Sequence, residues 1–203
     1  MTDAVHRLIE RRASITPDVV AILDGDRMTT YGELNQMGNA LARRLRESGL
    51  SRGSLAIVRM PRSTELAAML LAVLKAGACY AWTEPGSSED VSLPASVCIC
   101  RESSGEEEQF LALDIDRALS GPASQPGPNL PVLTRGTDVA CVLPDINGHP
   151  NVLVPHATIS ALPRTRPLRQ AWEGCAGALD LWMGLMSGTT MTVGVSSHAT
   201  AAA

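Results

Sequence analysis

The feature that most constrains the fold is a helix that is apolar on nearly every side and lies between two short apolar strands. Residues 54–59 and 79–83 have the composition of buried strands, and the helix between them begins at a capping Ser63 and runs through Lys75. Such a helix has to lie inside the molecule or against a sheet. Because strand, helix and strand follow one another, we expect the strands to pair in parallel. The sequence therefore predicts an α/β fold with a mixed, largely parallel sheet flanked by helices.

Shorter patterns predict the other elements. Thr30 and Glu33 stand three residues apart, as in a capping box, and an apolar stripe follows them. We expect Tyr31 to pack in the core. The further elements predicted are a first helix ending before Thr16, strands at 19–24, 27–30 and 96–100, a helix from Thr30 to Gly49, a strand entering at Val139, helical spacing over 176–186 and a strand over 191–195.

A proline- and glycine-rich stretch divides the chain. We expect a first α/β subdomain over residues 1–120, a linker over 121–136 and a reduced second subdomain over 137–195. Residues 196–203 carry no structural signal and are predicted to be a flexible tail.

Composition narrows the classes of function. The 203 residues are 45% hydrophobic, with a net charge of −4. This predicts a folded core and no nucleic-acid partner. Five cysteines without matched C-x-x-C pairs, no apolar signal segment and no apolar run near ~20 residues predict a reduced, cytoplasmic protein with no membrane span. Lys75 is the only lysine, and we interpret it as a charge at a helix C-terminus.

The loop between the apolar runs after Val139 and before His156 has the frame of a phosphate-binding loop but not its chemistry. A phosphate cradle needs small residues that expose backbone N–H groups, and a cation. Pro144 donates no N–H, Asp145 repels phosphate and Asn151 is uncharged. Ile146 is too bulky for a close backbone approach. We therefore predict no cofactor and no catalytic residue at the loop residues Pro144, Asp145, Ile146, Asn147, Gly148, His149 and Asn151.

Several segments in series resemble the amino-terminal part of the adenylation domains of nonribosomal peptide synthetases, which are acyl-adenylate-forming enzymes. Residues 28–35 (MTTYGELN) resemble the family's L-T-Y-x-E-L-N, and residues 74–85 (LKAGACYAWTEP) resemble L-K-A-G-x-x-Y-V-P-I-D-P. Residues 143–154 stand where the family has T-S-G-S-T-G-K-P-K-G-V-x, and 185–193 (LMSGTTMTV) resemble L-L-S-G-A-T-L-V. The resemblance covers about residues 5–195 and implies a partial amino-terminal domain of that fold.

The resemblance also implies losses. In the phosphate loop only Gly148 and Pro150 keep the family's identity, and Asn151 replaces the second lysine. Cys175 falls near the family's aspartate that pairs with the substrate amino group, and a thiol does not hold an ammonium group as a carboxylate does. The family's ribose- and magnesium-binding acids and its catalytic lysine would lie beyond the end of this chain.

Other candidate sites are weaker. His149 and His156 have no third ligand nearby in the sequence, so we predict no metal site. Residues 106–108 are three glutamates, expected to be a solvated turn, with a docking patch as the alternative. Three residues are candidates for a partner interface, because the rest of the family's fold would cover them: Trp172, Trp182 and Met183.

The leading hypothesis is a catalytically inactive, truncated adenylation-like domain that binds or scaffolds proteins in nonribosomal peptide biosynthesis. Its expected partner is a tailoring enzyme, a carrier domain or another synthetase module. One alternative is half of a split enzyme that forms an aminoacyl adenylate from ATP. Another is a fragment without function.

Overall fold

The computed structural model describes residues 3–86, 93–95, 97–100, 127–143, 151–162, 169–172 and 178–194. Its helices are α1 (Val5–Ile15), α2 (Tyr31–Glu47), α3 (Thr64–Ala76), α5 (His156–Ser160) and α6 (Ala178–Ser187). Its strands are β1 (Val20–Asp24), β2 (Arg27–Thr30), β3 (Leu55–Arg59), β4 (Cys79–Thr83), β5 (Val97–Cys100), β6 (Val139–Leu143), β7 (Val152–Pro155), β8 (Arg169–Trp172) and β9 (Thr190–Val193).

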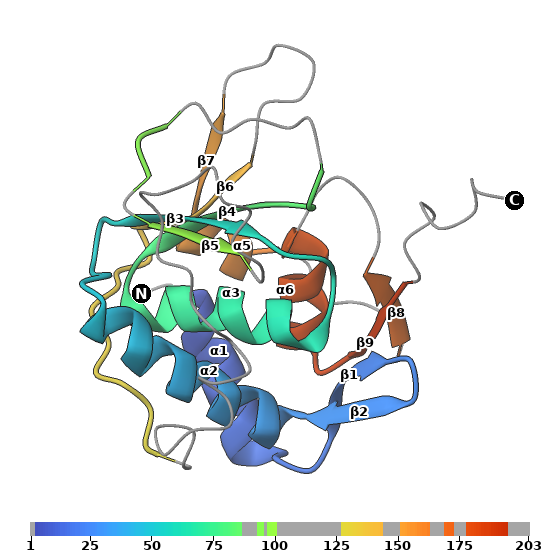
Figure 1. Ribbon diagram of the computed structural model, residues 1–203. Helices are drawn as coiled ribbons and strands as arrows, with labels where there is room; N and C mark the ends of the chain where they lie inside the picture. The colour runs from blue at the N-terminus through green and yellow to red at the C-terminus, as the bar shows by residue number, and fades with distance from the viewer. Residues whose placement is uncertain are drawn as a thin grey trace, which may run out of the picture.

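The strands form two sheets flanked by helices, which confirms the predicted fold class. One sheet has the order β5-β3-β4-β6-β7 and the other the order β2-β1-β9-β8. All neighbours are parallel except the hairpins β1–β2 and β6–β7. In Figure 1, α3 runs under the five-stranded sheet, and α1 and α2 form the next layer.

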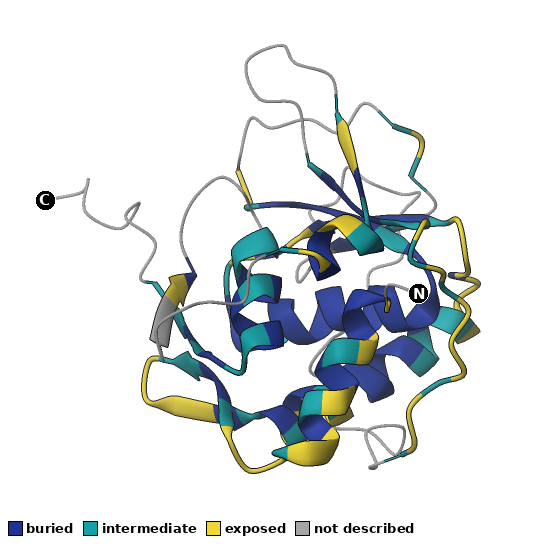
Figure 2. Cartoon of the chain, turned by 180° about the vertical axis from the view of Figure 1, so that it is seen from behind, coloured by how far each residue is buried: buried dark blue, intermediate teal, exposed yellow. Residues whose placement is uncertain are grey.

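Helix α3 is the central element, as its sequence predicts. Every residue of α3 except Glu65 is buried. The Ser63 hydroxyl accepts a hydrogen bond from the Leu66 N–H at 3.1 Å and caps the helix. Gly77 ends it at φ 95°, in the left-handed region. Figure 2 shows α3 dark along its length, whereas α1 and α2 also have exposed faces.

Helix α2 begins with the predicted capping box. The Thr30 hydroxyl accepts from the Glu33 N–H at 3.2 Å, and the Glu33 carboxylate accepts from the Thr30 N–H at 2.8 Å. Tyr31 is buried, and its hydroxyl donates to the carbonyl oxygen of Leu185 at 2.8 Å. The start of α2 is thereby joined to the end of α6.

One large hydrophobic core includes residues from both of the subdomains predicted from the sequence. Strand β6 pairs with β4, and β9 lies between β1 and β8, so each sheet contains strands from residues 1–120 and 137–195. The described part of the linker lies along α2, where the Asn39 amide donates to the Gly127 carbonyl oxygen and Arg46 to that of Pro131. The two stretches therefore share their core.

Strand β8 is an element that the sequence patterns do not predict. The stretch that contains β8 is basic and interrupted by prolines, so the sequence does not predict a strand there. Arg169–Trp172 nevertheless pairs in parallel with β9. Pairing with a distant strand, rather than the local sequence, determines the conformation of this short segment. The acidic residues 106–108, Cys175, residues 121–126 of the linker and the tail 196–203 lie outside the described residues. No helix of the described parts has the length and apolar character needed to cross a membrane.

Candidate functional site

The β6–β7 hairpin is the frame of the predicted phosphate loop. Strand β6 continues the parallel sheet beside β4, and Leu143 at its end is paired with Val152 at the start of β7. The loop therefore leaves the carboxyl end of a parallel strand, which is where open α/β sheets bind ligands. Residues 144–150 lie outside the described residues, so only Asn151 of the seven predicted loop positions is placed, directly before β7.

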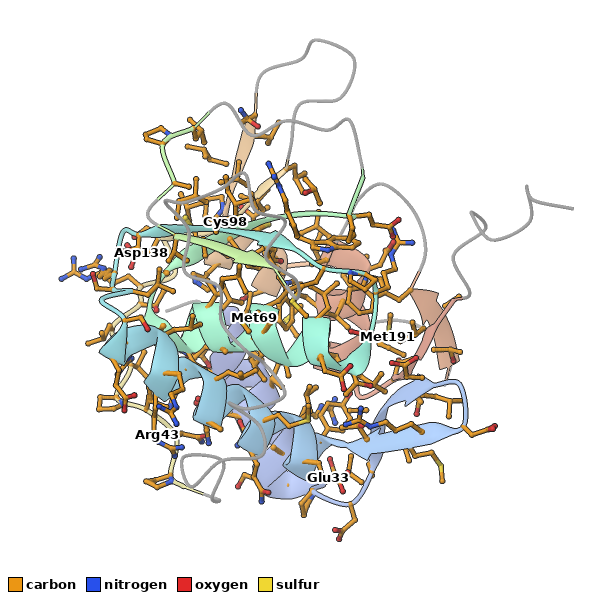
Figure 3. All side chains as sticks on the ribbon, viewed as in Figure 1. Glu33, Arg43, Met69, Cys98, Asp138 and Met191 are labelled. Atoms are coloured by element: carbon orange, nitrogen blue, oxygen red, sulfur yellow. The ribbon has the colours of Figure 1, made fainter. Side chains whose placement is uncertain are left out.

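The base of this hairpin is held by Asp138. Arg52 donates two hydrogen bonds to the Asp138 carboxylate, at 2.8 Å from Nε and 2.7 Å from the terminal nitrogen. The Arg135 N–H adds a third at 2.8 Å. The hydrogen bond from Arg52 is the main reason that the pKa of Asp138 falls to about 2. Figure 3 shows Asp138 at the side of the five-stranded sheet, away from the interior position of Met69.

The carboxyl ends of β3 and β4 carry a charged pair beside a tryptophan. Arg62 lies 3.2 Å from the Glu84 carboxylate, and its guanidinium is 5.1 Å from the centre of the Trp82 ring. The Trp82 indole N–H donates to the Met60 carbonyl oxygen at 2.8 Å. The Arg62 guanidinium is thus positioned by the Glu84 carboxylate and by the face of the Trp82 ring.

The only lysine of the chain lies in the last turn of α3, as predicted, and it is also buried. Lys75 Nζ lies 2.6 Å from Glu10 Oε1 and 3.2 Å from the Asn129 side-chain oxygen. Burial is the largest cause that lowers the pKa of Lys75, and the nearby Glu10 opposes it. The spacing of the sequence does not show this contact, because Glu10 and Lys75 come from helices far apart in the chain. Lys75 is therefore paired with Glu10 in the interior.

His156 is a buried structural residue at the start of α5. Its Nδ1 accepts from the Val5 N–H at 3.2 Å, and its ring makes an edge contact with that of His6, with centres 5.9 Å apart. Burial lowers the pKa of His6 to about 3 and that of His156 to about 4. Within the described ranges, no group of three or more His, Cys, Asp or Glu side chains could hold a metal ion. His149 lies outside them.

The two tryptophans proposed as interface candidates are core residues. Trp172 and Trp182 are both 0% exposed, and the Trp182 indole donates to the Tyr80 hydroxyl at 2.6 Å. Trp172 packs against Trp82 with ring centres 5.9 Å apart. The expectation that these two rings form an open interface is therefore wrong, because the chain covers them with its own side chains. Met183 on α6 is half-buried.

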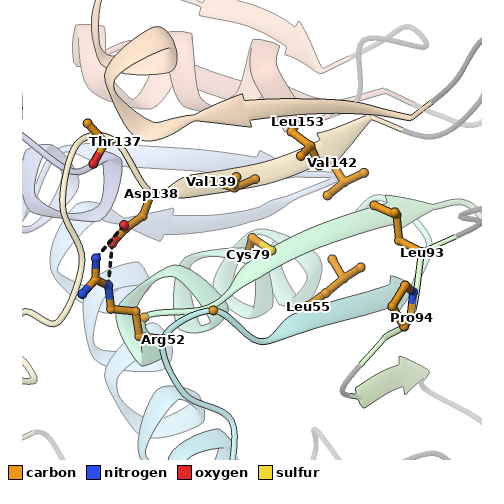
Figure 4. A pocket seen from close by; sticks show the side chains of 12 residues that line it. Arg52, Leu55, Cys79, Leu93, Pro94, Thr137, Asp138, Val139, Val142 and Leu153 are labelled. Carbon is orange, nitrogen blue, oxygen red and sulfur yellow. Dashed lines mark hydrogen bonds and ion pairs between the residues drawn. The ribbon is translucent and has the colours of Figure 1, made fainter.

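Strand β7 instead carries exposed apolar side chains. Val152 and Leu153 are 54% and 55% exposed. Leu153 lines a groove of about 750 Å³ together with Val139, Val142, Leu55 and Cys79. Figure 4 shows this groove between β7, β6 and the neighbouring strands, with Arg52 and Asp138 at one end. The sequence signal was present as an apolar run after Asn151, but the pattern alone does not show that the strand lies at an edge.

Comparison with known proteins identifies the fold. Residues 9–91 match the family described as AMP-binding enzyme. The chain is 31% identical to Tyrocidine synthase 3 of Brevibacillus parabrevis over 174 residues, and this alignment covers 76% of the chain and 3% of that synthase. It is 30% identical to Surfactin synthase subunit 2 of Bacillus subtilis (strain 168), over 93% of the chain and 6% of that subunit. The chain thus spans a small fraction of the length of these relatives.

A solved structure with the same fold is the amino-terminal subdomain of Klebsiella oxytoca NpsA. The TM-score is 0.81 at 26% identity, and the match covers 95% of this chain and 55% of that one. The family match over residues 9–91, the synthetase relatives and this structural match agree. The chain therefore belongs with the AMP-binding enzymes and corresponds to the amino-terminal part of a nonribosomal peptide synthetase adenylation domain.

Proposed function

We propose that this chain is a protein-binding or scaffolding module of nonribosomal peptide biosynthesis that forms no adenylate by itself. The observation that carries this proposal is a phosphate loop whose strand frame is retained while its cation is lost. Leu143 and Val152 are paired at the mouth of the loop. Residues 139–156 contain no lysine or arginine and include Asp145.

The rest of the chain offers no lysine to replace the lost charge. Its one lysine, Lys75, pairs with Glu10 in the interior. An ATP triphosphate held only by an acidic loop would be repelled, because its negative charge needs cationic or backbone N–H partners. The fold has nevertheless kept its capped helices and its common core. A retained fold without its phosphate chemistry favours a role that uses the molecular surface.

The partners that fit this context are a carrier domain, a tailoring enzyme or another synthetase module. Calorimetry with each purified protein tests the role, and we expect at least one of them to bind. Amino-acid-dependent pyrophosphate exchange tests the absence of catalysis, and we expect none from this chain. Exchange by the chain alone, or the absence of binding to all three classes, would contradict the proposal.

Half of a split adenylating enzyme is a second candidate, favoured by the fold: 95% of this chain matches the amino-terminal subdomain of Klebsiella oxytoca NpsA at a TM-score of 0.81. A complementary polypeptide would supply the remaining residues, but Pro144, Asp145 and Asn151 would stay in the loop. Pyrophosphate exchange that appears only when the two polypeptides are mixed would identify this function.

A further inference from the structure

We propose that α5 is an acid-sensitive clasp on the start of α1, in which the neutral imidazole of His156 takes the place of an N-cap side chain. The clasp consists of two side chains one helical turn apart on α5, His156 and Ser160, which hold residues 3–5. It joins the first helix of the chain to the segment that follows β7.

The first observation is that α1 has no cap of its own. The first N–H groups of a helix have no partner within it, and a Ser, Thr, Asp or Asn side chain before the helix commonly accepts from one of them. Ala4 occupies this position and makes no side-chain hydrogen bond. Instead, the Nδ1 of His156 accepts from the Val5 N–H at 3.2 Å. The Ser160 hydroxyl adds a second contact, because it donates to the Asp3 carbonyl oxygen at 2.7 Å.

The second observation is that the backbone around His156 is anchored. The His156 N–H donates to the Asp138 carbonyl oxygen at 3.0 Å, and the Ala157 N–H donates to that of Gly136 at 2.8 Å. The His156 side chain is buried and contacts the ring of His6. Because Nδ1 accepts a hydrogen bond, the single proton of the neutral ring is on Nε2. The fold therefore selects one tautomer of His156.

The third observation is that the closed clasp has no place for a second proton on His156. A protonated imidazole is a donor at both nitrogens. At Nδ1 the added proton would face the Val5 N–H, which is also a donor, and the positive end of the α1 dipole. At Nε2 there is no hydrogen-bond partner within the described residues. The charged ring would lose the capping bond and gain none, so protonation favours an open clasp.

The surrounding charges, with one exception, also oppose protonation. Burial is the cause that lowers the pKa of His156 to about 4, and Asp138 acts against it. Burial is also the largest cause that lowers the pKa of His6 to about 3. Of the other elements that contact α5, β7 has no titratable side chain and α6 has only Asp180. The groups that add to the effect of burial on His6 are, in decreasing order, His156, Lys75, Arg7 and Arg46.

The clasp should therefore open as the pH falls. In the open clasp the ring of His156 has its ordinary pKa of 6.5, whereas in the closed clasp its pKa is about 4. The contribution of the clasp is complete above about pH 6.5 and is lost as the pH falls from there toward 4. Between pH 7 and pH 5, these two values raise the ratio of open to closed clasp about twentyfold.

Amide exchange of Val5, measured by NMR and expressed as a protection factor, tests the clasp. This N–H has no partner within α1, so its protection reports the hydrogen bond to His156. The pH series is measured on the wild type and on His6→Phe, in which His156 is the only titratable ring of the pair. We expect the protection factor of Val5 in His6→Phe to fall about twentyfold from pH 7 to pH 5, and that of the wild type to fall by no less.

Two further substitutions in the His6→Phe chain separate the proton from the hydrogen bond. His156→Asn places an amide oxygen acceptor near the position of Nδ1 but takes up no proton in this range. We expect it to keep Val5 protected at pH 7 and to remove most of the fall at pH 5. Ser160→Ala is the control, because it removes the bond to Asp3 and keeps the imidazole. It should lower the protection of Val5 at both pH values and leave the ratio between them unchanged.

Proton–nitrogen correlation NMR of the histidine rings provides the second measurement on the wild type. We expect His156 to carry its proton on Nε2 at pH 7. A ring that carries it on Nδ1 would overturn the cap. A fall in Val5 protection that is the same with and without His156→Asn would overturn the role of its protonation. Either result would leave the proposed function standing, because neither residue of the clasp contributes to it.

Discussion

At the scale of single residues, the Lys75–Glu10 pair joins α3 to α1 inside the molecule. The two side chains are 0% and 5% exposed. Because water cannot solvate a buried charge whose partner is removed, breaking such a pair costs about 3–5 kcal/mol, whereas an apolar replacement of both groups is often neutral. We expect Glu10→Gln to lower the free energy of unfolding by that amount, measured by urea denaturation, and Glu10→Leu with Lys75→Met to lower it far less.

The matched control is Glu47→Gln. Glu47 pairs with Arg44 at 3.7 Å on the surface, where the side chains are 65% and 39% exposed. Exposed pairs contribute about 0–1 kcal/mol. A Glu10→Gln variant as stable as Glu47→Gln would contradict this expectation. It would show that the buried Lys75 charge is compensated by a group other than Glu10.

The buried histidines predict a loss of stability in mild acid. The pKa values of His6 and His156 in the folded chain, about 3 and about 4, lie below their ordinary value of 6.5. The unfolded chain therefore takes up protons below pH 6.5 that the folded chain does not, and the free energy of unfolding falls as the pH drops from about 6.5 toward 4. The slope approaches about 1.4 kcal/mol per pH unit for each histidine.

Denaturation at a series of pH values measures this slope. Asp138, whose pKa is lowered to about 2, loses its contribution only below about pH 4, so the range from pH 6.5 to 5 isolates the histidines from this carboxylate. His6→Phe should reduce the slope there by about half. A free energy of unfolding that is constant between pH 7 and 5 would contradict the neutral, buried state of both rings.

At the scale of elements, the glycine that ends α3 has two separate requirements. Gly77 has φ 95°, and an added Cβ would lie 3.3 Å from Leu133 Cβ. Gly53 has a similar φ of 86° but open space around it. The backbone cost of alanine at positive φ is about 1–2 kcal/mol at either position. We expect Gly77→Ala to destabilise more than Gly53→Ala in urea denaturation, and the difference measures the contact with Leu133. Equal losses would mean that this segment moves aside without cost.

Elements with a strong local signal could be predicted from the sequence, and those that depend on distant partners could not. The capping box at Thr30 and Glu33 and the end of α3 at Gly77 are local, and both form as expected. Strand β8 forms because β9 lies beside it, and no pattern within Arg169–Trp172 indicates that β9 will be its neighbour. The burial of Lys75 and Trp172 has the same origin, since their partners come from remote parts of the chain.

At the scale of the whole molecule, the shared core predicts cooperative unfolding. Strand β6 lies between β4 and β7, and β9 lies between β1 and β8, so residues 137–195 cannot leave without breaking both sheets. We expect one transition in urea, with the same midpoint by far-ultraviolet circular dichroism and by tryptophan fluorescence. Variants that keep only Trp82 or only Trp182 would report on the two predicted subdomains separately. Different midpoints would show that the two subdomains on either side of residues 121–136 unfold independently.

The site was partly predictable. The frame of the phosphate loop follows from two apolar runs around residues 144–150, and the structure pairs these runs as β6 and β7. The edge position of β7 and its groove depend on the order of strands in the sheet. That order could not be predicted from the sequence patterns.

We propose that this adenylation fold does not bind a nucleotide. Calorimetric titration of the purified chain with ATP and magnesium tests it most directly, with an active adenylation domain as the positive control. We expect only the heat of dilution up to millimolar ATP, because Pro144 donates no N–H, Asp145 repels phosphate and the loop contains no lysine or arginine. Saturable binding with one ATP per chain would contradict this account and return the chain to the active or split adenylating enzymes.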